Sequence, residues 1–212
     1  MTFRFCDDLG HHGFSWIVDE PMTRTSHALA TDEDVFLIDP VDWPEAVDRA
    51  ASLGTPAGVI QLLDRHNRDA AALAQRLGVP RLVVPESLPG TPFEVIGIKR
   101  SKRWQEIALW WPELRVLVAA DALGSNPFFT IGDDRLGVHP FLKLTPPRRL
   151  RVLEPEHVLV GHGAGVHGPD ATIALHQALS RSRLTALRWV AALPFRMRRK
   201  TTTPAKPEPD ES

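Results

Sequence analysis

The sequence predicts an α/β fold in which mixed β-sheet is covered by helices. Short apolar segments rich in β-branched and aromatic residues recur along the chain at the length of strands. Some neighbouring segments are joined by short polar turns, as in antiparallel hairpins, whereas others are separated by helical patterns, as in crossovers between parallel strands. A chain that carries both kinds of connection forms a mixed sheet.

Composition restricts the class of protein. The chain has 212 residues, which suits one compact domain, and 43% of them are apolar, which is enough for a proper core. Cys6 is the only cysteine, so an internal disulfide and a cysteine-based zinc site are excluded. The formal net charge of -1 gives no reason to expect a nucleic-acid partner. The oligomeric state is left open.

The N-terminus lacks the basic and apolar layout of a signal peptide. Apolar runs along the chain fall short of the roughly 18 residues of a membrane span. We therefore expect a soluble, cytoplasmic protein that acts on or binds a small molecule.

In the first half of the chain, strands precede helices. In order, we expect elements at residues 14–18, 25–30, 34–40, 44–53, 58–63 and 68–77. The polar residues 31–33 form the turn of a hairpin between the strands at 25–30 and 34–40. The fourth is a helix, because Pro44 favours a first helical position and Gly54 a helix end. The fifth is a strand and the sixth a second helix.

The second half adds strands, a long loop and a final helix. In order, we expect elements at residues 81–84, 93–98, 106–111, 115–121, 157–160 and 170–193. A short turn at Pro112 joins the strands at 106–111 and 115–121 into an antiparallel pair. Residues 123–155 form a long loop of the kind that is functional or contains short helices. A single domain over residues 1–195 is followed by a basic, then Pro-rich and acidic tail at residues 196–212, which we expect to be disordered.

Three apolar runs end abruptly in ionisable side chains. Asp64 and His66 follow the first run, Asp121 follows the second, and His162 lies between two glycines after the third. If these strands end at one edge, two carboxylates and two imidazoles share a cleft, and such groups are ligands for zinc, iron or manganese. The pattern favours a shared site whose side chains suit a divalent metal ion.

A purely structural interpretation of the same residues stays open. Asp64 and Arg68, and likewise Arg65 and Asp69, are spaced as i,i+4 pairs that stabilise the first turn of a helix. Asp121 could form an Asx turn after its strand. Each residue alone favours this interpretation, whereas the three strand ends together favour a shared site.

The order of these segments resembles the metallo-β-lactamase fold superfamily. The resemblance rests on SHALATDEDVFLIDP, the His/Asp cluster, RVLVAADAL and HVLVGHG, and it covers residues 26–168. It implies a four-layer αββα sandwich of two mixed β-sheets flanked by helices, and metal-dependent hydrolase chemistry. Members usually carry H-x-H-x-D-H after a strand, a further His before a later strand, an Asp after the next strand and a last His in G-H-G.

Three ligand positions of that pattern match in residue type. His66 corresponds to the second His of the first motif, Asp121 to the bridging Asp and His162 to the last His. Asp64 and Asp69 replace the first and third His of the motif, and their oxygens remain able to bind a metal.

Two further positions depart from the pattern by becoming cationic. Arg68 stands in place of the metal-binding Asp, and Lys102 or Arg103 stands in place of the middle His. Because a cation has no lone pair to donate, a two-zinc site is not expected. The resemblance thus implies a degenerate site that holds one metal ion or none.

Two functions follow from this degenerate site. The first is a hydrolase of small ester, thioester, lactone or phosphodiester-like molecules, with Asp121 and Asp69 as catalytic carboxylates. Its metal ligands would be drawn from His66, Asp121, His162, Asp64 and Asp69.

The second function is that of a non-catalytic pseudoenzyme whose cationic cleft binds an anionic ligand or a protein partner. The ligand-binding side chains would be Arg68, Lys102, Arg103 and His139. A third possibility is a scaffold in which the cluster is only a salt-bridged core.

Overall fold

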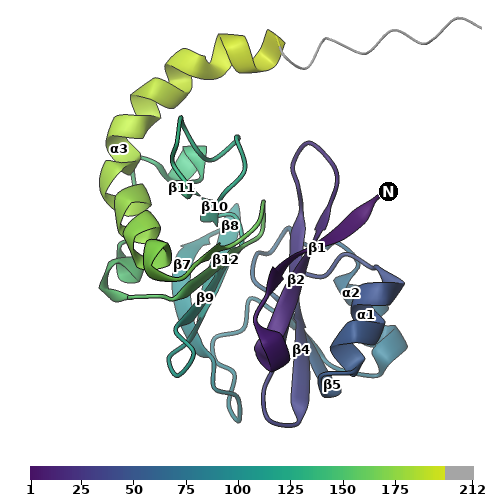
Figure 1. Cartoon of the computed structure of the whole chain (residues 1–212). Helices are drawn as coiled ribbons and strands as arrows, with labels where there is room; N and C mark the ends of the chain where they lie inside the picture. Colours follow the sequence, from purple (N-terminus) through teal and green to yellow (C-terminus); the bar gives the residue numbers. More distant parts are fainter. Residues whose placement is uncertain (199–212) are drawn as a thin grey trace, which may run out of the picture.

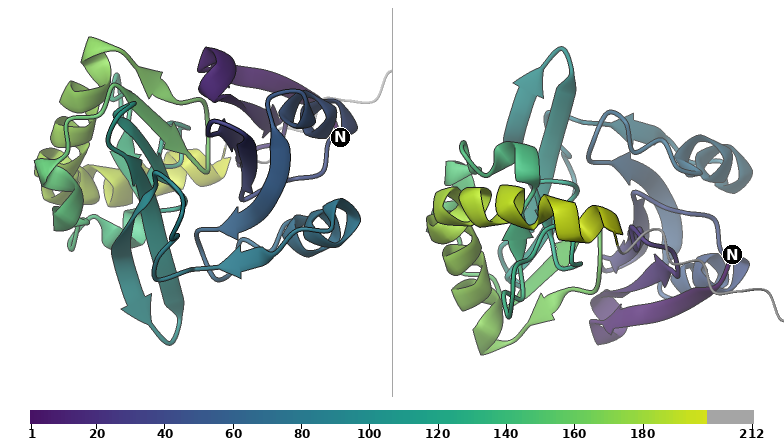
Figure 2. Two further views of the ribbon diagram at one scale, coloured as in Figure 1. Left: turned by 90° about the horizontal axis from the view of Figure 1, so that it is seen from below. Right: turned by 90° about the horizontal axis from the view of Figure 1, so that it is seen from above.

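The computed structural model describes residues 1–198, with side chains described up to residue 186. Two β-sheets pack face to face, helices α1 and α2 cover the outside of one, and helix α3 covers the outside of the other (Figure 1). The views from above and below show the same order of layers (Figure 2). The predicted four-layer αββα sandwich is confirmed.

The first sheet joins an antiparallel meander to a parallel βαβ region. It consists of β1 (Phe3–Asp8), β2 (Gly13–Val18), β3 (Thr25–Ala30), β4 (Asp34–Ile38), β5 (Thr55–Gln61) and β6 (Arg81–Val83), in that order. Helix α1 (Pro44–Ala51) connects β4 to β5, and helix α2 (Ala70–Leu77) connects β5 to β6. Both connections join parallel strands, whereas β1 to β4 pair antiparallel.

The second sheet is mixed as well. Its order is β13 (Val166–His167), β12 (His157–Val160), β9 (Val116–Ala119), β8 (Trp104–Trp111) and β7 (Glu94–Ser101). Strands β9 and β12 are parallel and lie in the middle, where every residue of β9 is buried. The predicted antiparallel pair is β8 and β9.

The long loop between the two halves of this sheet contains short elements, as expected. They are β10 (Leu123–Gly124), β11 (Gly137–Val138) and the 3₁₀ turns η2 (Pro140–Leu142) and η3 (Arg148–Val152). Helix α3 (Pro169–Arg198) follows β13.

Apolar side chains of the two sheets form the main core. Ile60 and Leu62 of the first sheet belong to the same buried cluster as Leu109, Val118 and Leu159 of the second. A smaller cluster lies under α1 and α2. Burial on both faces explains why the central strands read as unbroken apolar runs.

Some predicted boundaries were wrong. Helix α2 begins at Ala70 rather than at residue 68, because Arg68 adopts a φ of 38°, which no α-helix accommodates. The i,i+4 interpretation of Arg68 is therefore wrong. Strand β5 begins at Thr55, and the strands β1 and β13 were not predicted.

The C-terminal helix was also placed too short. Helix α3 continues to Arg198, three residues into the predicted tail. Residues 199–212 lie outside the described part of the chain. No helix among the described residues is long and apolar enough to cross a membrane.

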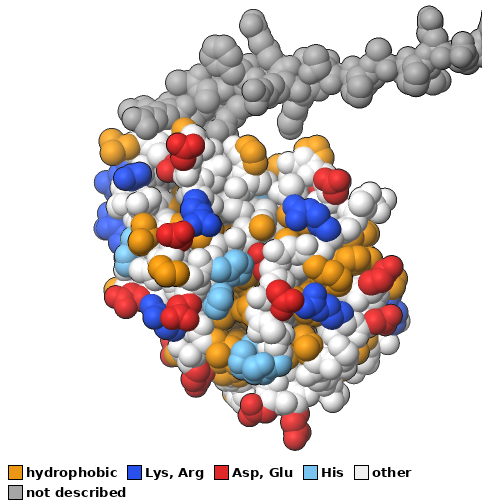
Figure 3. All heavy atoms as spheres, viewed as in Figure 1, with side chains coloured by type: hydrophobic (Ala, Val, Ile, Leu, Met, Phe, Trp, Pro, Cys, Tyr) orange, Lys and Arg blue, Asp and Glu red, His pale blue; other side chains and the backbone are white. Residues whose placement is uncertain are grey.

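Charged side chains of both signs are interspersed on the face shown in Figure 3. This distribution agrees with the formal net charge of -1.

Candidate metal centre

Three ionisable side chains converge where the two sheets meet. Ligand atoms of His66, Asp121 and His162 all lie within 4.8 Å of one another. The residues are 8%, 9% and 7% exposed. We call this group the His-Asp-His centre.

Strand register places two of the three side chains. Ala119 of β9 pairs with Val160 of β12 in parallel, so Asp121 and His162 each lie two residues beyond the last pair. His66 comes from the turn after β5 in the opposite sheet. The contact of the two sheets therefore completes the centre.

Asp121 links both imidazoles through one oxygen. Its Oδ1 lies 2.9 Å from Nε2 of His66 and 3.1 Å from Nε2 of His162. Burial raises the pKa of Asp121, but the hydrogen bonds from His162 and His66 outweigh burial, so its pKa lies well below the usual value. Asp121 is an anion at neutral pH.

Each imidazole is oriented through its other nitrogen. Nδ1 of His162 lies 2.8 Å from the backbone oxygen of Met22, and Nδ1 of His66 lies 2.9 Å from Oδ2 of Asp39. Because both partners are acceptors, each Nδ1 carries a proton, and each Nε2 points at Asp121. Carbonyl and carboxylate partners of this kind orient metal-binding histidines.

Asp39 was not recognised from the sequence as a site residue. It is 1% exposed, and its Oδ1 accepts a hydrogen bond of 3.0 Å from the Leu62 backbone N–H. The signal was present, because Asp39 follows an apolar strand as Asp121 does. Burial and the charge of Arg68 lower the pKa of His66, but the carboxylates of Asp39 and Asp121 raise it to above its usual value.

Arg68 ties three strand ends together beside the centre. Its guanidinium donates to the backbone oxygens of Thr25, Asp39 and Gly161, at 2.5, 2.7 and 3.1 Å respectively. These carbonyls belong to β3 and to the segments that follow β4 and β12. The terminal nitrogens are therefore used by the protein itself, and Nε is buried without a hydrogen-bond partner.

Asp64 and Asp69 lie outside the group of converging ligand atoms in the described part of the chain. Asp69 is the residue just before α2, and its Oδ2 accepts a hydrogen bond of 2.9 Å from the backbone N–H of Asp42. Oδ2 of Asp64 accepts one of 3.1 Å from Gln105 N–H, while its Oδ1 is buried without a partner. Both carboxylates hold backbone segments together.

The predicted cationic ligand-binding residues lie at different distances from the centre. Lys102 and Arg103 are exposed in the turn between β7 and β8. Arg65, which was assigned only an ion pair within a helix, is a cation in contact with Asp121 of the centre. Its Nη2 lies 3.6 Å from Oδ2 of Asp121, and its guanidinium lies 4.1 Å above the Trp104 ring.

The ring of Phe129 lies between His139 and His162 of the His-Asp-His centre. The ring centroid of His139 is 5.5 Å from that of Phe129, which in turn stacks on His162 at 5.6 Å. Nδ1 of His139 accepts a hydrogen bond from Phe141 N–H and so caps η2. Burial lowers the pKa of His139 to about 4, so the ring is neutral at pH 7.

Glu106 is a second residue that sequence reasoning missed. It is fully buried, and its two carboxyl oxygens accept from Ala122 N–H at 2.7 Å and from Trp104 Nε1–H at 2.6 Å. Burial raises its pKa to about 8. The bond to Ala122 fixes the turn that carries Asp121.

Comparisons with known proteins concern the fold. No family model matches the chain, and no curated protein is significantly similar in sequence. A metallo-β-lactamase from Pontibacter korlensis superimposes with a TM-score of 0.61 at 11% identity, covering 88% of this chain and 99% of that one. A metallo-β-lactamase from Hirschia baltica gives 0.57 at 8% identity, covering 84% and 98%. The chain has the metallo-β-lactamase fold.

A third structure with the metallo-β-lactamase fold is a mono-zinc form. FIM-1 from Pseudomonas aeruginosa, described in its mono-zinc form, superimposes with a TM-score of 0.55 at 10% identity, covering 86% of this chain and 96% of that one. Identities this low relate the folds and leave the chemistry of this chain to its own residues.

Proposed function

We propose that the chain is a hydrolase-like protein of the metallo-β-lactamase fold whose His-Asp-His centre holds one divalent metal ion. The observation that supports it best is the direction of the imidazoles. Both Nδ1 atoms are held by acceptors, so two Nε2 atoms and one carboxylate oxygen face the same point. Two imidazoles and a carboxylate form a ligand set that suits zinc, iron or manganese.

The charges at this point support the same assignment. An Nε2 without a proton would direct its lone pair at the Asp121 oxygen, which is repulsive at 2.9 Å and 3.1 Å. Two protons, which turn both rings into imidazolium, remove this repulsion. One divalent ion supplies the same added charge and accepts all three lone pairs.

A single ion fits these residues better than two. A second ion would need the carboxylates of Asp64 and Asp69, which accept backbone hydrogen bonds, and would lie near the fixed positive charge of Arg68. Three protein ligands with an open fourth position are sufficient for a catalytic metal. The mono-zinc form of FIM-1 is a precedent within the fold.

A bound ion would lower the pKa of a water ligand and polarise the scissile bond. The remaining steps belong to the chain. Asp121 Oδ2 lies 3.6 Å from Nη2 of Arg65, and this carboxylate would orient the water and take up its proton. Arg65, whose side chain is 44% exposed, is placed to bind a carboxylate or phosphate of a small ester-type substrate.

The test is metal stoichiometry on protein purified without chelators. We expect about one zinc, iron or manganese ion per chain and loss of that ion in His66→Ala and His162→Ala. The matched control is His176→Ala, because the His176 side chain lies 2.9 Å from the Leu153 carbonyl oxygen and lies outside the centre. Metal well below one per chain in every preparation, and no zinc binding on titration, would contradict the proposal.

A non-catalytic anion-binding protein is the second candidate. It is favoured by the cover over the centre, since Phe129 is 1% exposed and stacks on His162. Under this alternative, the two imidazoles and Asp121 form a hydrogen-bonded cluster without a metal ion, and a small anion binds at Arg65. A thermal shift with small carboxylates or phosphates that disappears in Arg65→Ala, in protein free of metal, would favour it over the hydrolase.

A further inference from the structure

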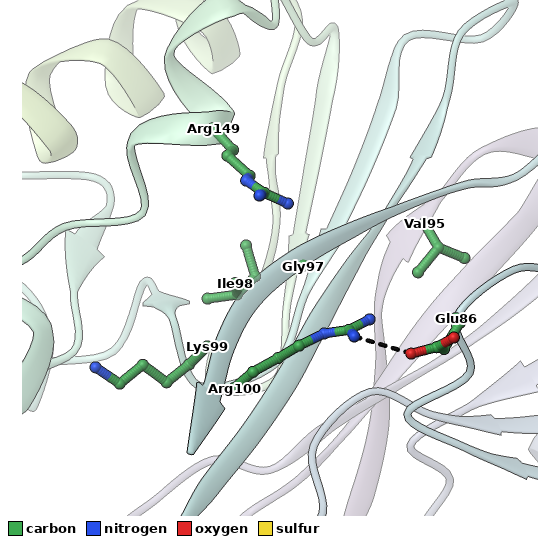
Figure 4. A pocket seen from close by; sticks show the side chains of 7 residues that line it. All are labelled: Glu86, Val95, Gly97, Ile98, Lys99, Arg100 and Arg149. Atoms are coloured by element: carbon green, nitrogen blue, oxygen red, sulfur yellow. Dashed lines mark hydrogen bonds and ion pairs between the residues drawn. The ribbon is translucent and has the colours of Figure 1, made fainter.

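The edge strand of the second sheet carries a cationic groove. We call it the β7 groove, a hollow of about 510 Å³ between β7 and η3 (Figure 4). The lining residues that matter for the argument are Glu86, Val95, Ile98, Lys99, Arg100 and Arg149. The residues that line it are different from those of the His-Asp-His centre.

Positive charge in the groove is not balanced. Three cations and one carboxylate line it, whereas the whole chain has a net charge of -1. Glu86 pairs with Arg100 at 2.9 Å. Lys99 and Arg149 have no acidic partner within ion-pair distance in the described part of the chain. Two positive charges are thus available to an anion.

Two guanidinium groups approach the same backbone position. A Cβ at Gly97 would lie 3.5 Å from Nη1 of Arg149 and 3.9 Å from Nε of Arg100. Arg149 reaches this point from η3 and Arg100 from β7 itself, and Figure 4 shows both side chains beside Gly97. Like charges that converge over a residue without a side chain leave room for an anion between them.

The position of Arg149 is set by its neighbours. Pro147 precedes η3 and is buried, and Leu150, the next residue, is completely buried. These anchors keep the backbone of η3 against β7. The exposed side chain of Arg149 therefore extends into the groove from a fixed backbone position.

An adjoining hollow gives the groove an apolar extension. It measures about 350 Å³, shares Lys99 and Arg149 with the groove, and is also lined by Leu142, by Pro146 and by two further arginines. A pair of guanidinium groups matches a phosphate dianion, and an apolar wall matches an organic body. We propose that the β7 groove binds the phosphate group of a small organic phosphomonoester.

Isothermal titration of the full chain tests this site. The probes are inorganic phosphate, phenyl phosphate and succinate at fixed ionic strength. Phenyl phosphate is expected to bind more tightly than inorganic phosphate, and succinate more weakly than either. Arg149→Ala should weaken phenyl phosphate at least tenfold, whereas Arg4→Ala, which removes an exposed cation on β1, should leave it unchanged.

Two further variants distinguish binding in the β7 groove from binding at the His-Asp-His centre. Gly97→Ala keeps every charge but fills the point of convergence, and it should weaken phenyl phosphate severalfold. Arg65→Ala should leave the affinity for phenyl phosphate unchanged, because Arg65 lies beside the His-Asp-His centre and outside the β7 groove. Loss of binding in Arg65→Ala, with none in Arg149→Ala, would place the ligand at the centre and overturn the proposal. The proposal is overturned if Arg149→Ala binds like wild type, if Arg4→Ala weakens binding equally, or if succinate binds as well as phosphate. It is also overturned if neither phenyl phosphate nor inorganic phosphate binds.

Discussion

Oδ1 of Asp121 lies 2.9 Å from Nε2 of His66, although the two residues follow strands of different sheets. This contact needs the two sheets to pack in one fixed relation. Changes that loosen the sheet interface should therefore disturb the His-Asp-His centre before they unfold the chain. Such changes can be made at residues that support the centre without being one of its three members.

Asp39→Asn should weaken metal binding. The amide keeps the size of the side chain but loses the charge that orients the Nδ1 proton of His66. Loss of such an outer partner typically costs about 10- to 100-fold in affinity. Competition with a chromogenic zinc chelator measures the change, and circular dichroism controls for folding. Affinity equal to that of wild type would show that Asp39 only supports the Leu62 backbone.

Arg68→Met should destabilise the fold. The change removes donors from three backbone carbonyls, so we expect a loss of about 2–4 kcal/mol in the free energy of unfolding. Urea denaturation followed by tryptophan fluorescence measures it.

The matched control is Arg76→Met. Arg76 pairs with Asp42 at the surface, and such a pair contributes about 0–1 kcal/mol. Equal losses in the two variants would mean that the buried carbonyl contacts of Arg68 contribute no more than a surface ion pair.

The strand ends of the site were readable from the sequence. Asp121 and His162 follow unbroken apolar runs, because β9 and β12 are buried on both faces. Such runs identify strands, and the ionisable residue after each run marks the strand end.

The contacts between distant segments could not be predicted from the sequence. Arg68 lies outside helix α2 because its guanidinium donates hydrogen bonds to three backbone carbonyls, those of residues 25, 39 and 161. Glu106 sits within a strand pattern, and only tertiary contact with Ala122 and Trp104 gives it a role. These roles depend on how the sheets pack, and periodicity within one segment carries no information about that.

Glu106→Ala should cost stability near the centre. Two buried N–H groups, of Ala122 and the Trp104 indole, would lose their acceptor. We expect a loss of about 2–4 kcal/mol in the free energy of unfolding. Chemical denaturation measures it, with Glu94→Ala on β7 as control because Glu94 is exposed. If both variants unfold at the same urea concentration as wild type, water has replaced the carboxylate.

The stability of the fold should fall below pH 6.5 through His27. This residue is 1% exposed, its Nδ1 lies 2.8 Å from Ser15 Oγ, and burial lowers its pKa to about 4. In the unfolded chain it binds a proton below about pH 6.5, whereas in the folded chain it stays neutral down to about pH 4. Protons therefore favour the unfolded state between about pH 6.5 and pH 4. The contribution of His27 to the free energy of unfolding, about 3 kcal/mol, is lost as the pH falls through this range.

His27→Gln tests that assignment, because the amide keeps a polar side chain for Ser15 and does not titrate. Urea denaturation at pH 7 and pH 4.5 gives the two unfolding free energies for each protein. The drop between the two pH values should be smaller in the variant by about 2–3 kcal/mol. His11→Gln is the control, because His11 is exposed and its change should leave the drop as in wild type. An equal drop in His27→Gln and wild type would assign the acid sensitivity to other groups.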